Sequence, residues 1–324
     1  MKKNIAVVTG GNSSEIVISL RSAEQVRQCV DSDDFQAFIV YIKGDDWHVV
    51  MEDSTEHPVN RHDFTFQLGG LTIGFDFVFF AMHGPPGEDG KLQAYFDLIG
   101  IPYSTSGVLS LAMTFNKNAT KKFLSGYGIK MAGSILIKKE DQYDLNKIID
   151  TLGLPCFIKP NSGGSSFGVS KINRTESLEE AVGEAMKEDS EVLVESFIEG
   201  NELTCGLVKF ENDELIFPVC EVISKKEFFD YEAKYTEGMA DEVIPAQIPD
   251  DLAIQCQKQA SKIYSLLGCR GIVRVDFINH NGELYFLELN GIPGMTKESI
   301  VPKMIRAHRI TEKEVYRRII EELS

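Results

Sequence analysis

Residues 271–299 read GIVRVDFINHNGELYFLELNGIPGMTKES, and this stretch predicts two β-strands joined by a tight turn. Side chains alternate between the two faces of a strand, so Arg274 and Asp276 share one face of the first strand. By the same alternation Glu288 and Asn290 share one face of the second strand, and apolar side chains take the other. Carboxylates stand here where a strand of a soluble protein is usually apolar, so the hairpin is the candidate centre of a functional site.

The turn decides whether the two polar faces coincide. A two-residue turn (281–282) would put Asp276 and Glu288 on opposite faces of the sheet. A three-residue turn (280–282) would instead place Arg274 directly across from Glu288. We expect the three-residue turn, or a bulge that has the same result.

In the expected arrangement, Asp276, Glu288 and Asn290 surround one point with oxygen donors only. Oxygen ligands suit Mg²⁺, which keeps several waters and takes further ligands from substrate phosphates. The hairpin therefore predicts a platform for a magnesium-bound nucleotide. The alternative is a hairpin at a sheet edge with one polar face in solvent. The turn at 291–294 (GIPG) bends backbone towards the same face and favours the functional interpretation.

The bulk composition predicts a globular cytoplasmic protein. A chain of 324 residues with 43% hydrophobic residues has room for two or three domains with ample cores. The net charge of −16 argues against a nucleic-acid backbone or an anionic membrane as partner. No apolar run resembles a signal peptide or a membrane span. The six cysteines occur singly, as expected of core residues in a reducing compartment.

The N-terminal segment predicts the start of an α/β domain. An apolar strand at 4–9 ends in two glycines, and a helix follows to about residue 30, so a ligand would gather at the helix N-terminus. Glu15 lies at this turn. It either forms a capping box with Asn12 or holds a substrate ammonium group.

Two more buried strands, at 35–42 and 76–81, extend the same domain. The second runs into HGPPGEDG (83–90), a loop that three glycines and two prolines fix at the strand's carboxyl end, and a helix follows at 91–99. His83 lies either at the mouth of a cleft or in a rigid surface turn.

A glycine- and serine-rich loop marks the middle of the chain. The strand at 156–159 ends in Lys159 and continues into PNSGGSSFG (160–168). Such a loop presents backbone N–H groups and hydroxyls that suit phosphate oxygens, and Lys159 would meet a phosphate from the side. The alternative is a hairpin with a polar turn.

The last third of the chain predicts an antiparallel sheet with a lid. The segment 223–244 is long, charged and rich in aromatic residues. Its length is typical of a functional loop, and its aromatic residues argue against disorder. The other elements that we expect here are strands at 191–195, 203–208 and 215–222, the hairpin, and helices at 252–267 and 310–323.

Taken in order, several segments of the chain resemble the D-alanine–D-alanine ligases of the ATP-grasp superfamily: GGNSSE, HGPPGEDG, IPYSTSG, GGSSFG, EAKY, RVD and LELNGIPGMT. The combination of HGPPGEDG, EAKY and NGIPGMT is specific to that family. The resemblance covers nearly the whole chain and implies an α/β fold, α+β in parts, with three domains. These would be an N-terminal α/β substrate-binding domain (1–103), a central ATP-grasp subdomain with the glycine-rich loop (104–190), and a C-terminal antiparallel-sheet subdomain with the metal site and lid (191–324).

The resemblance also implies a set of site residues, with ATP between the second and third domains. The residues implied for ATP are Lys117, Lys159, Ser166, Glu195, Phe197, Ile198 and Glu202. The ligands implied for two Mg²⁺ ions, with Mn²⁺ as a substitute, are Asp276, Glu288 and Asn290. The residues implied for catalysis are Glu15, Ser165, Lys234, Tyr235, Arg274 and Gly294, and those implied for substrate binding are His83, Ser299 and Ile300.

The implied roles follow the reaction of the family. Glu15 would hold the ammonium of the first D-alanine and would form a hydrogen-bond chain with Ser165 and Tyr235. Arg274 and the backbone N–H of Gly294 would stabilise an oxyanion. Lys234 would reach the transferring phosphate, and Ser299 and Ile300 would contact the second D-alanine.

The implied reaction joins two D-alanines through an acyl phosphate, at the expense of ATP, for peptidoglycan precursors. The alternatives are a ligase of the same fold that takes D-lactate or D-serine second, and an ATP-binding sensor without turnover. Tyr235 within EAKY resembles the dipeptide-forming branch. The partners expected are D-alanine, ATP and a second copy of the chain as a homodimer.

Overall fold

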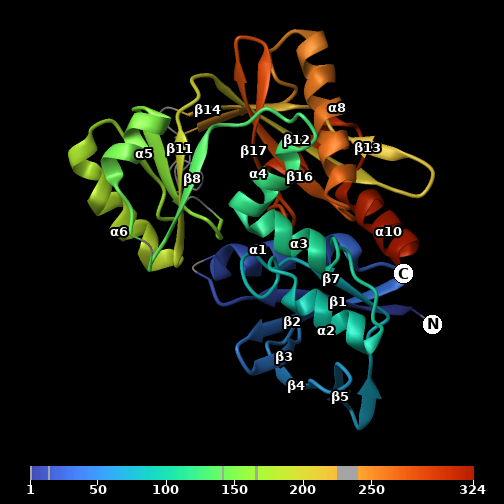
Figure 1. The fold of residues 1–324 in the computed structure, drawn as a ribbon. Helices are drawn as coiled ribbons and strands as arrows, with labels where there is room; N and C mark the ends of the chain where they lie inside the picture. The colour runs from blue at the N-terminus through green and yellow to red at the C-terminus, as the bar shows by residue number, and fades with distance from the viewer. Residues whose placement is uncertain (1, 14, 141, 165–166, 225–239) are drawn as a thin grey trace.

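The described part of the chain folds into three β-sheets with helices packed around them (Figure 1). This computed structural model describes residues 2–13, 15–140, 142–164, 167–224 and 240–324. The predicted α/β class with antiparallel sheets in the later part is confirmed. No helix in these ranges combines the length and the apolar character needed to cross a membrane.

The N-terminal sheet has the strand order β6-β5-β4-β3-β2-β1-β7, with β1 parallel to both β2 and β7. Parallel strands need covered faces, which explains the continuous apolar runs in β1 and β7. Its elements are β1 (Lys3–Gly10), α1 (Ile16–Val30), β2 (Phe35–Lys43), β3 (Asp46–Val50), β4 (Glu56–Asn60), β5 (Thr65–Leu68), β6 (Leu71–Ile73), β7 (Phe77–Phe80) and α2 (Lys91–Ile99).

The capping box at the start of α1 does not form. Glu15 is the residue at the N-cap, and no side chain caps the helix there. Asn12 Oδ1 instead accepts a hydrogen bond from the N–H of Gly44, at 3.1 Å, in the turn between β2 and β3. That alternative for Glu15 is therefore wrong, and its side chain is used elsewhere.

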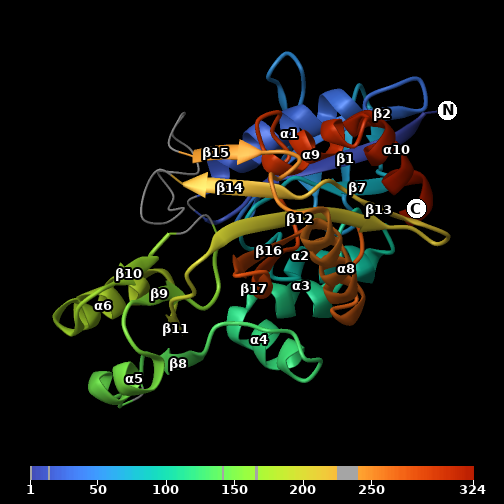
Figure 2. The ribbon, with the colours of Figure 1, turned by 90° about the horizontal axis from the view of Figure 1, so that it is seen from above.

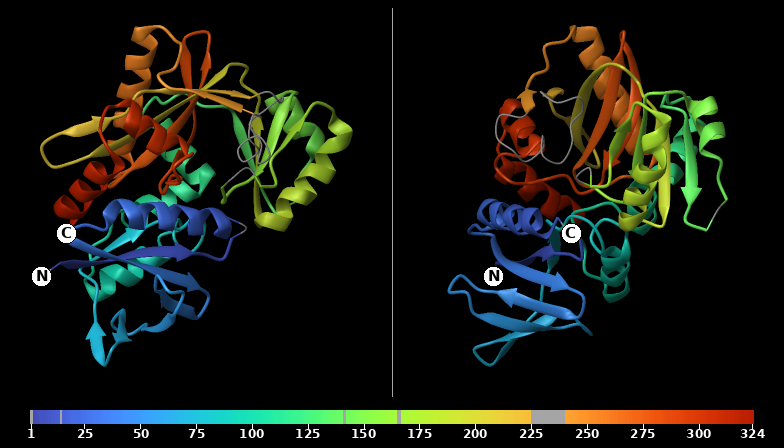
Figure 3. Two further views of the ribbon diagram at one scale, coloured as in Figure 1. Left: turned by 180° about the vertical axis from the view of Figure 1, so that it is seen from behind. Right: turned by 90° about the vertical axis from the view of Figure 1, so that its left-hand side faces the viewer.

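The central sheet is antiparallel in the order β10-β9-β11-β8 and has a core of its own. Figure 3 shows this sheet and its two covering helices as a separate lobe. Its elements are β8 (Ser134–Lys138), α5 (Leu145–Leu152), β9 (Cys156–Pro160), β10 (Ser170–Ile172), the 3-10 turn η1 (Thr175–Ser177), α6 (Leu178–Glu188) and β11 (Glu191–Ser196).

The domain boundaries predicted around this sheet need correction. β11 pairs with both β8 and β9, so the central unit continues through Ser196 and does not end at residue 190. At the other end, α3 (Val108–Phe115) contacts β17, and Leu124 of α4 (Lys117–Ser125) lies in the core of the C-terminal sheet. The segment that begins at residue 104 therefore packs on the C-terminal sheet before the chain enters β8.

The C-terminal sheet has the order β15-β14-β12-β16-β17, and β13 pairs with β12. The strand predicted at 215–222 is divided into β13 and β14, which both pair with the long strand β12. Its elements are β12 (Asn201–Lys209), β13 (Glu214–Ile216), β14 (Cys220–Ser224), β15 (Ala240–Val243), α8 (Asp250–Leu266), β16 (Val273–His280), β17 (Glu283–Asn290), α9 (Ile300–Ala307) and α10 (Glu312–Leu323).

The first and last parts of the chain share one hydrophobic core. Apolar side chains of β1, β7 and α1 pack with those of α9 and α10, and α1 lies beside α10 in Figure 2. The rings of Phe79 and Tyr316 lie 5.1 Å apart within this core. The chain therefore returns to its N-terminal sheet, which fixes that sheet against the C-terminal sheet.

The motif IPYSTSG (101–107) contacts the C-terminal part of the chain at residues 270–271. Ser106 Oγ donates to the carbonyl of Arg270 and accepts from its N–H, at 3.1 and 3.0 Å. Gly271 lies just after, with φ +68°, and a Cβ there would come within 1.9 Å of Ser104 O. Only glycine allows so close a contact between two backbones.

We therefore expect Gly271→Ala to destabilise the protein strongly, because backbone on both sides must move. Gly268→Ala is the matched control: its φ is +62°, but a Cβ there meets nothing within 4 Å. The control should cost only the left-handed penalty of about 1 kcal/mol. Thermal melts of the two variants measure the difference, and equal melting temperatures would contradict this account of the junction.

Candidate active site

The hairpin of β16 and β17 brings its polar faces together by a bulge. The turn is the two-residue one, with positive φ at Asn281 (52°) and Gly282 (86°), so the expected three-residue turn is wrong. The register shifts between 276 and 277, and this irregularity places Asp276 across from Glu288. The coincidence of the two faces is confirmed. The predicted pairing of Arg274 with Glu288 is wrong, because Arg274 lies across from Asn290.

Asp276 is the buried centre of this face, with only 2% of its surface exposed. Its two oxygens accept hydrogen bonds from Arg274 Nε and Nη2, both at 2.8 Å, and from Asn290 Nδ2 at 2.9 Å. Thr204 Oγ1, from the neighbouring strand β12, also donates to Asp276. Thr204 was not predicted, since only the pairing of β12 with β16 brings it here.

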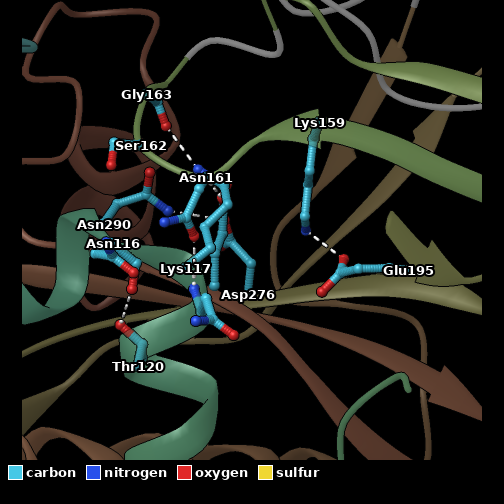
Figure 4. A network of polar contacts seen from close by, with 12 residues as sticks. Asn116, Lys117, Thr120, Lys159, Asn161, Ser162, Gly163, Glu195, Asp276 and Asn290 are labelled. Carbon is cyan, nitrogen blue, oxygen red and sulfur yellow. Dashed lines mark hydrogen bonds and ion pairs between the residues drawn. The ribbon is translucent and has the colours of Figure 1, made fainter. Parts of the chain in front are cut away.

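Lys117 connects the hairpin to the glycine-rich loop. Its Nζ donates to the carbonyl of Gly163 at 2.7 Å and lies 3.7 Å from Glu288 Oε2, as Figure 4 shows for the loop side. The first turn of α4 is held by Asn161, whose carbonyl and side-chain oxygens each accept a backbone N–H at 2.9 Å. Asn161 was not predicted as a site residue. The role implied for Lys117, contact with the phosphates of ATP, stays a prediction.

A second polar cluster lies between the central sheet and α4, and Figure 4 shows its pair of Lys159 and Glu195. Glu195 of β11 forms ion pairs with Lys159 of β9 and with Lys121 of α4. Burial raises the pKa of Glu195, but the two lysines outweigh it, so the net shift is downward and the carboxylate is ionised. Lys121 was missed, although its spacing of four residues from Lys117 puts both on one face of a helix.

The other residues predicted for ATP follow on the same chain segment. Phe197 and Ile198 lie in the connection between β11 and β12, which is the link from the central to the C-terminal sheet. The Phe197 ring packs near that of Phe157, and Lys171 Nζ lies 4.5 Å above its centre. Glu202 lies on β12, two residues before Thr204.

The N-terminal unit contributes Glu15 and His83, both of which are buried. His83 Nε2 lies 3.4 Å from Ser22 Oγ, and burial lowers the pKa of its imidazole. A Cβ on Gly164 would lie 3.0 Å from Glu15 Oε1, so the carboxylate directly meets the glycine-rich loop. Because His83 is buried, the alternative that it lies in a surface turn is excluded.

Glu88 was not predicted and lies in the same region. Its Oε2 accepts the N–H of Gly84 at 2.8 Å, which closes the loop of the HGPPGEDG motif. Burial, followed by the neighbouring Glu15 carboxylate, raises the pKa of Glu88 to about 8. The sequence shows that Glu88 is an acidic residue of this motif, but it does not show that Glu88 is buried.

The remaining predicted residues fall into two groups. Ser299 is the N-cap residue of α9, and its Oγ accepts the N–H of Thr296 at 3.1 Å, while a Cβ on Gly294 would lie 2.8 Å from that oxygen. Ile300 is buried in the core that the N-terminal sheet shares with α9 and α10. The predictions made for Ser165, Ser166, Lys234 and Tyr235 lie outside the residues that the structure describes.

A small cavity lies where these units meet. It has a volume of about 30 Å³, and its wall includes Glu88, Lys117, Gly164, Glu288 and Asn290. That volume suits one or two waters and is far below that of a triphosphate.

The donor set on the hairpin fits a magnesium ion. In the described ranges no three His, Cys, Asp or Glu side chains gather into a cluster that could hold a metal by themselves. Asp276, Glu288 and Asn290 nevertheless put two carboxylates and an amide on one sheet face. Asn290 turns its Nδ2 towards Asp276, to which it donates, and this leaves the amide oxygen for a cation. Such a partial oxygen set is usual for Mg²⁺, which is completed by water and phosphate.

A mixed N-terminal sheet followed by two antiparallel sheets, with lysines and carboxylates between them, defines the ATP-grasp class. Two family models match the chain: "D-ala D-ala ligase N-terminus" over residues 4–106 and "D-ala D-ala ligase C-terminus" over residues 123–321. The chain belongs to the D-alanine–D-alanine ligase family.

Relatives and solved structures agree with this family. The D-alanine–D-alanine ligase of Phocaeicola vulgatus is 45% identical over 99% of both chains, and that of Azobacteroides pseudotrichonymphae is 46% identical over 99% of this chain and 100% of its own. The VanG D-Ala:D-Ser ligase of Enterococcus faecalis has a TM-score of 0.89 at 32% identity and 100% coverage of both chains. The Bacillus anthracis ligase complexed with ATP has a TM-score of 0.79 at 28% identity, over 99% of this chain and 97% of its own.

Proposed function

We propose that this protein is an ATP-dependent ligase that joins two D-alanines into D-alanyl-D-alanine, with release of ADP and phosphate. The observation that carries the proposal is the position of Lys117, whose ammonium touches both the glycine-rich loop and Glu288 of the hairpin. A cation at this place faces the phosphates of a nucleotide bound between the central and C-terminal sheets. Family membership over the full chain supports the same reaction.

The first step transfers the γ-phosphoryl group to a carboxylate oxygen of the first D-alanine, and ADP leaves. Glu15 holds the ammonium of that D-alanine from the N-terminal side, and His83 lines the same pocket. Lys117 and Lys159 offset the negative charge of the phosphates, with Lys234 and Ser166 as further contacts. Bound Mg²⁺ (or Mn²⁺), held by Asp276, Glu288 and Asn290, would supply charge neutralisation at the phosphates.

In the second step the amine of the second D-alanine attacks the acyl phosphate carbon. The peptide bond forms, the C–O bond to phosphate breaks, and the amine loses a proton to the departing phosphate. Arg274 uses one edge of its guanidinium, Nε and Nη2, to hold Asp276, which leaves Nη1 on the other edge for the developing oxyanion. Gly294 provides a backbone N–H for the same oxygen. Ser299 and Ile300 fix the second D-alanine, and Ser165 and Tyr235 link the loop and lid to Glu15.

The nucleotide base and ribose occupy the link between β11 and β12. Glu195 offers an ionised acceptor to the base, and Phe197, Ile198 and Glu202 complete its surroundings. The partners of the enzyme are ATP, D-alanine and a second copy of the chain, without nucleic acid or membrane. The use of ATP places the reaction in the cytoplasm, where it supplies peptidoglycan precursors.

The test is phosphate release by the purified protein with ATP, Mg²⁺ and D-alanine at neutral pH. We expect release that depends on D-alanine, with D-alanyl-D-alanine as the product. Parallel reactions with D-serine or D-lactate beside D-alanine identify a different second substrate. Binding of ATP without D-alanine-dependent release would leave only the function of a nucleotide sensor.

A further inference from the structure

The cluster of Lys121, Lys159 and Glu195 contains two positive charges and one negative charge. The three residues are 5%, 6% and 4% exposed, and both lysines pair with the one carboxylate. An unpaired buried charge is costly, and one lysine already neutralises one carboxylate. The cluster thus buries a net positive charge, which an arriving anion would compensate.

The two lysines differ in how firmly they are held. Lys121 Nζ also donates to the carbonyl of Ala132 at 2.9 Å, and its helix is anchored in the core of the C-terminal sheet by Leu124. For Lys159, the partner found among the described residues is Glu195. Lys159 also lies on the strand that runs directly into the glycine-rich loop. Lys121 is therefore the fixed cation and Lys159 the exchangeable one.

We propose that Lys121 is a positioning residue: as the permanent counter-ion of Glu195, it allows Lys159 to leave that carboxylate and bind a phosphate of the nucleoside triphosphate. This inference rests on the proposed function, in which Lys159 binds ATP phosphate. Without Lys121, the exchange would leave Glu195 buried and unpaired. Lys159 would then stay with Glu195, or Glu195 would have to take up a proton.

The pKa directions agree with a carboxylate that depends on both cations. Burial by itself raises the pKa of Glu195, and the charges of Lys159 and Lys121 bring it below its usual value. Burial lowers the pKa of Lys121, and Glu195 opposes that shift. The pair formed by Lys121 and Glu195 also joins two separate cores, since α4 packs on the C-terminal sheet and β11 belongs to the central one.

The experiment measures ATP binding to the full-length protein by calorimetry, with Mg²⁺ and without D-alanine, from pH 8 to pH 6. We expect Lys121→Met to weaken ATP binding about 100-fold at pH 8, the cost of leaving one buried charge unpaired. The loss should shrink by up to about tenfold for each unit that the pH falls, because one proton on Glu195 replaces the missing cation. Lys122→Met, which removes the exposed neighbouring lysine, is the matched control and should follow the unchanged protein at each pH.

Two results would overturn the proposal. One is ATP binding by Lys121→Met that equals that of Lys122→Met. The other is a loss of the same size at every pH, which would mean that Lys121 touches the nucleotide itself or only shapes the fold. The double variant Lys121→Met/Glu195→Gln separates the proposed role of Lys121 from direct contact with the nucleotide and from a purely structural role. Without the carboxylate charge, the double variant should bind ATP more tightly than Lys121→Met. No restoration would contradict the proposed role.

A measurement without substitution covers the case in which Lys121→Met does not fold. In a crystal structure of the unchanged protein with a non-hydrolysable ATP analogue, Lys159 Nζ should bind a phosphate oxygen while Lys121 Nζ remains on Glu195. Lys159 still paired with Glu195 would overturn the inference. Because ATP binding is measured apart from turnover, normal binding without D-alanine-dependent phosphate release would refute the proposed function and leave this inference standing.

Discussion

Glu288→Gln should reduce D-alanine-dependent phosphate release about 1,000-fold while the protein keeps its melting temperature. Glu288 is a partly exposed side chain on the polar face of β17, and Gln has the same shape. The change therefore removes a charge from the proposed metal site without opening a cavity. A divalent ion contributes several kcal/mol of charge stabilisation in phosphoryl transfer, and each 1.36 kcal/mol corresponds to a factor of ten in rate.

Glu283→Gln is the matched control for this variant. Glu283 lies on the same strand, pairs with the exposed Lys130 and is remote from the glycine-rich loop. It should retain the full rate, because an exposed ion pair contributes little. If Glu288→Gln also retained nearly the full rate, Glu288 would not be a ligand of the ion, and the metal site would have to be sought elsewhere.

Arg274→Met should destabilise the protein by about 3–5 kcal/mol. Asp276 is almost completely buried, and Arg274 is the cation that forms two hydrogen bonds with it. Removal of one partner from a buried pair leaves the other charge uncompensated. Chemical denaturation followed by circular dichroism measures the loss. Arg274→Met/Asp276→Asn should recover most of it, because the buried charge is then gone as well.

Arg317→Met is the control for a pair at the surface. Arg317 forms ion pairs with Asp34 and Glu321 in solvent, and its loss should leave the denaturation midpoint unchanged within error. A similar small effect for Arg274→Met would show that Asp276 is stabilised by Thr204 and Asn290 without its arginine. Loss of activity with full stability would then assign Arg274 to catalysis alone.

Several elements could be predicted from local patterns because their causes are local. The helix at 91–99 was expected at the bounds that α2 has, and a glycine follows its last residue. The alternation of polar residues on β16 and β17 likewise identified Asp276, Glu288 and Asn290 as one polar set. The region from β3 to β6 carried no such prediction, since its strands are short and partly exposed.

Other predictions failed where the cause was not local. We expected a three-residue turn, or a bulge with the same result, because either would bring the two polar faces together. The turn has two residues, and a bulge shifts the register. The pairing of β11 with β8 and β9 also extends the central unit from residue 190 to residue 196. The local sequence predicts neither a bulge nor the partner of a strand, because both depend on contacts with distant segments.

The sequence by itself determined the residue types of the site, namely oxygen donors on a strand, a glycine-rich loop after a lysine, and the order of motifs that identifies the family. Only the tertiary structure decided which of these charges meet. It brought Lys121 and Lys159 to one carboxylate and buried all three, placed Glu15 against Gly164, and joined the two ends of the chain in one core. The physical reason is that side-chain chemistry belongs to each residue, whereas burial and charge pairing arise only between segments that folding brings together.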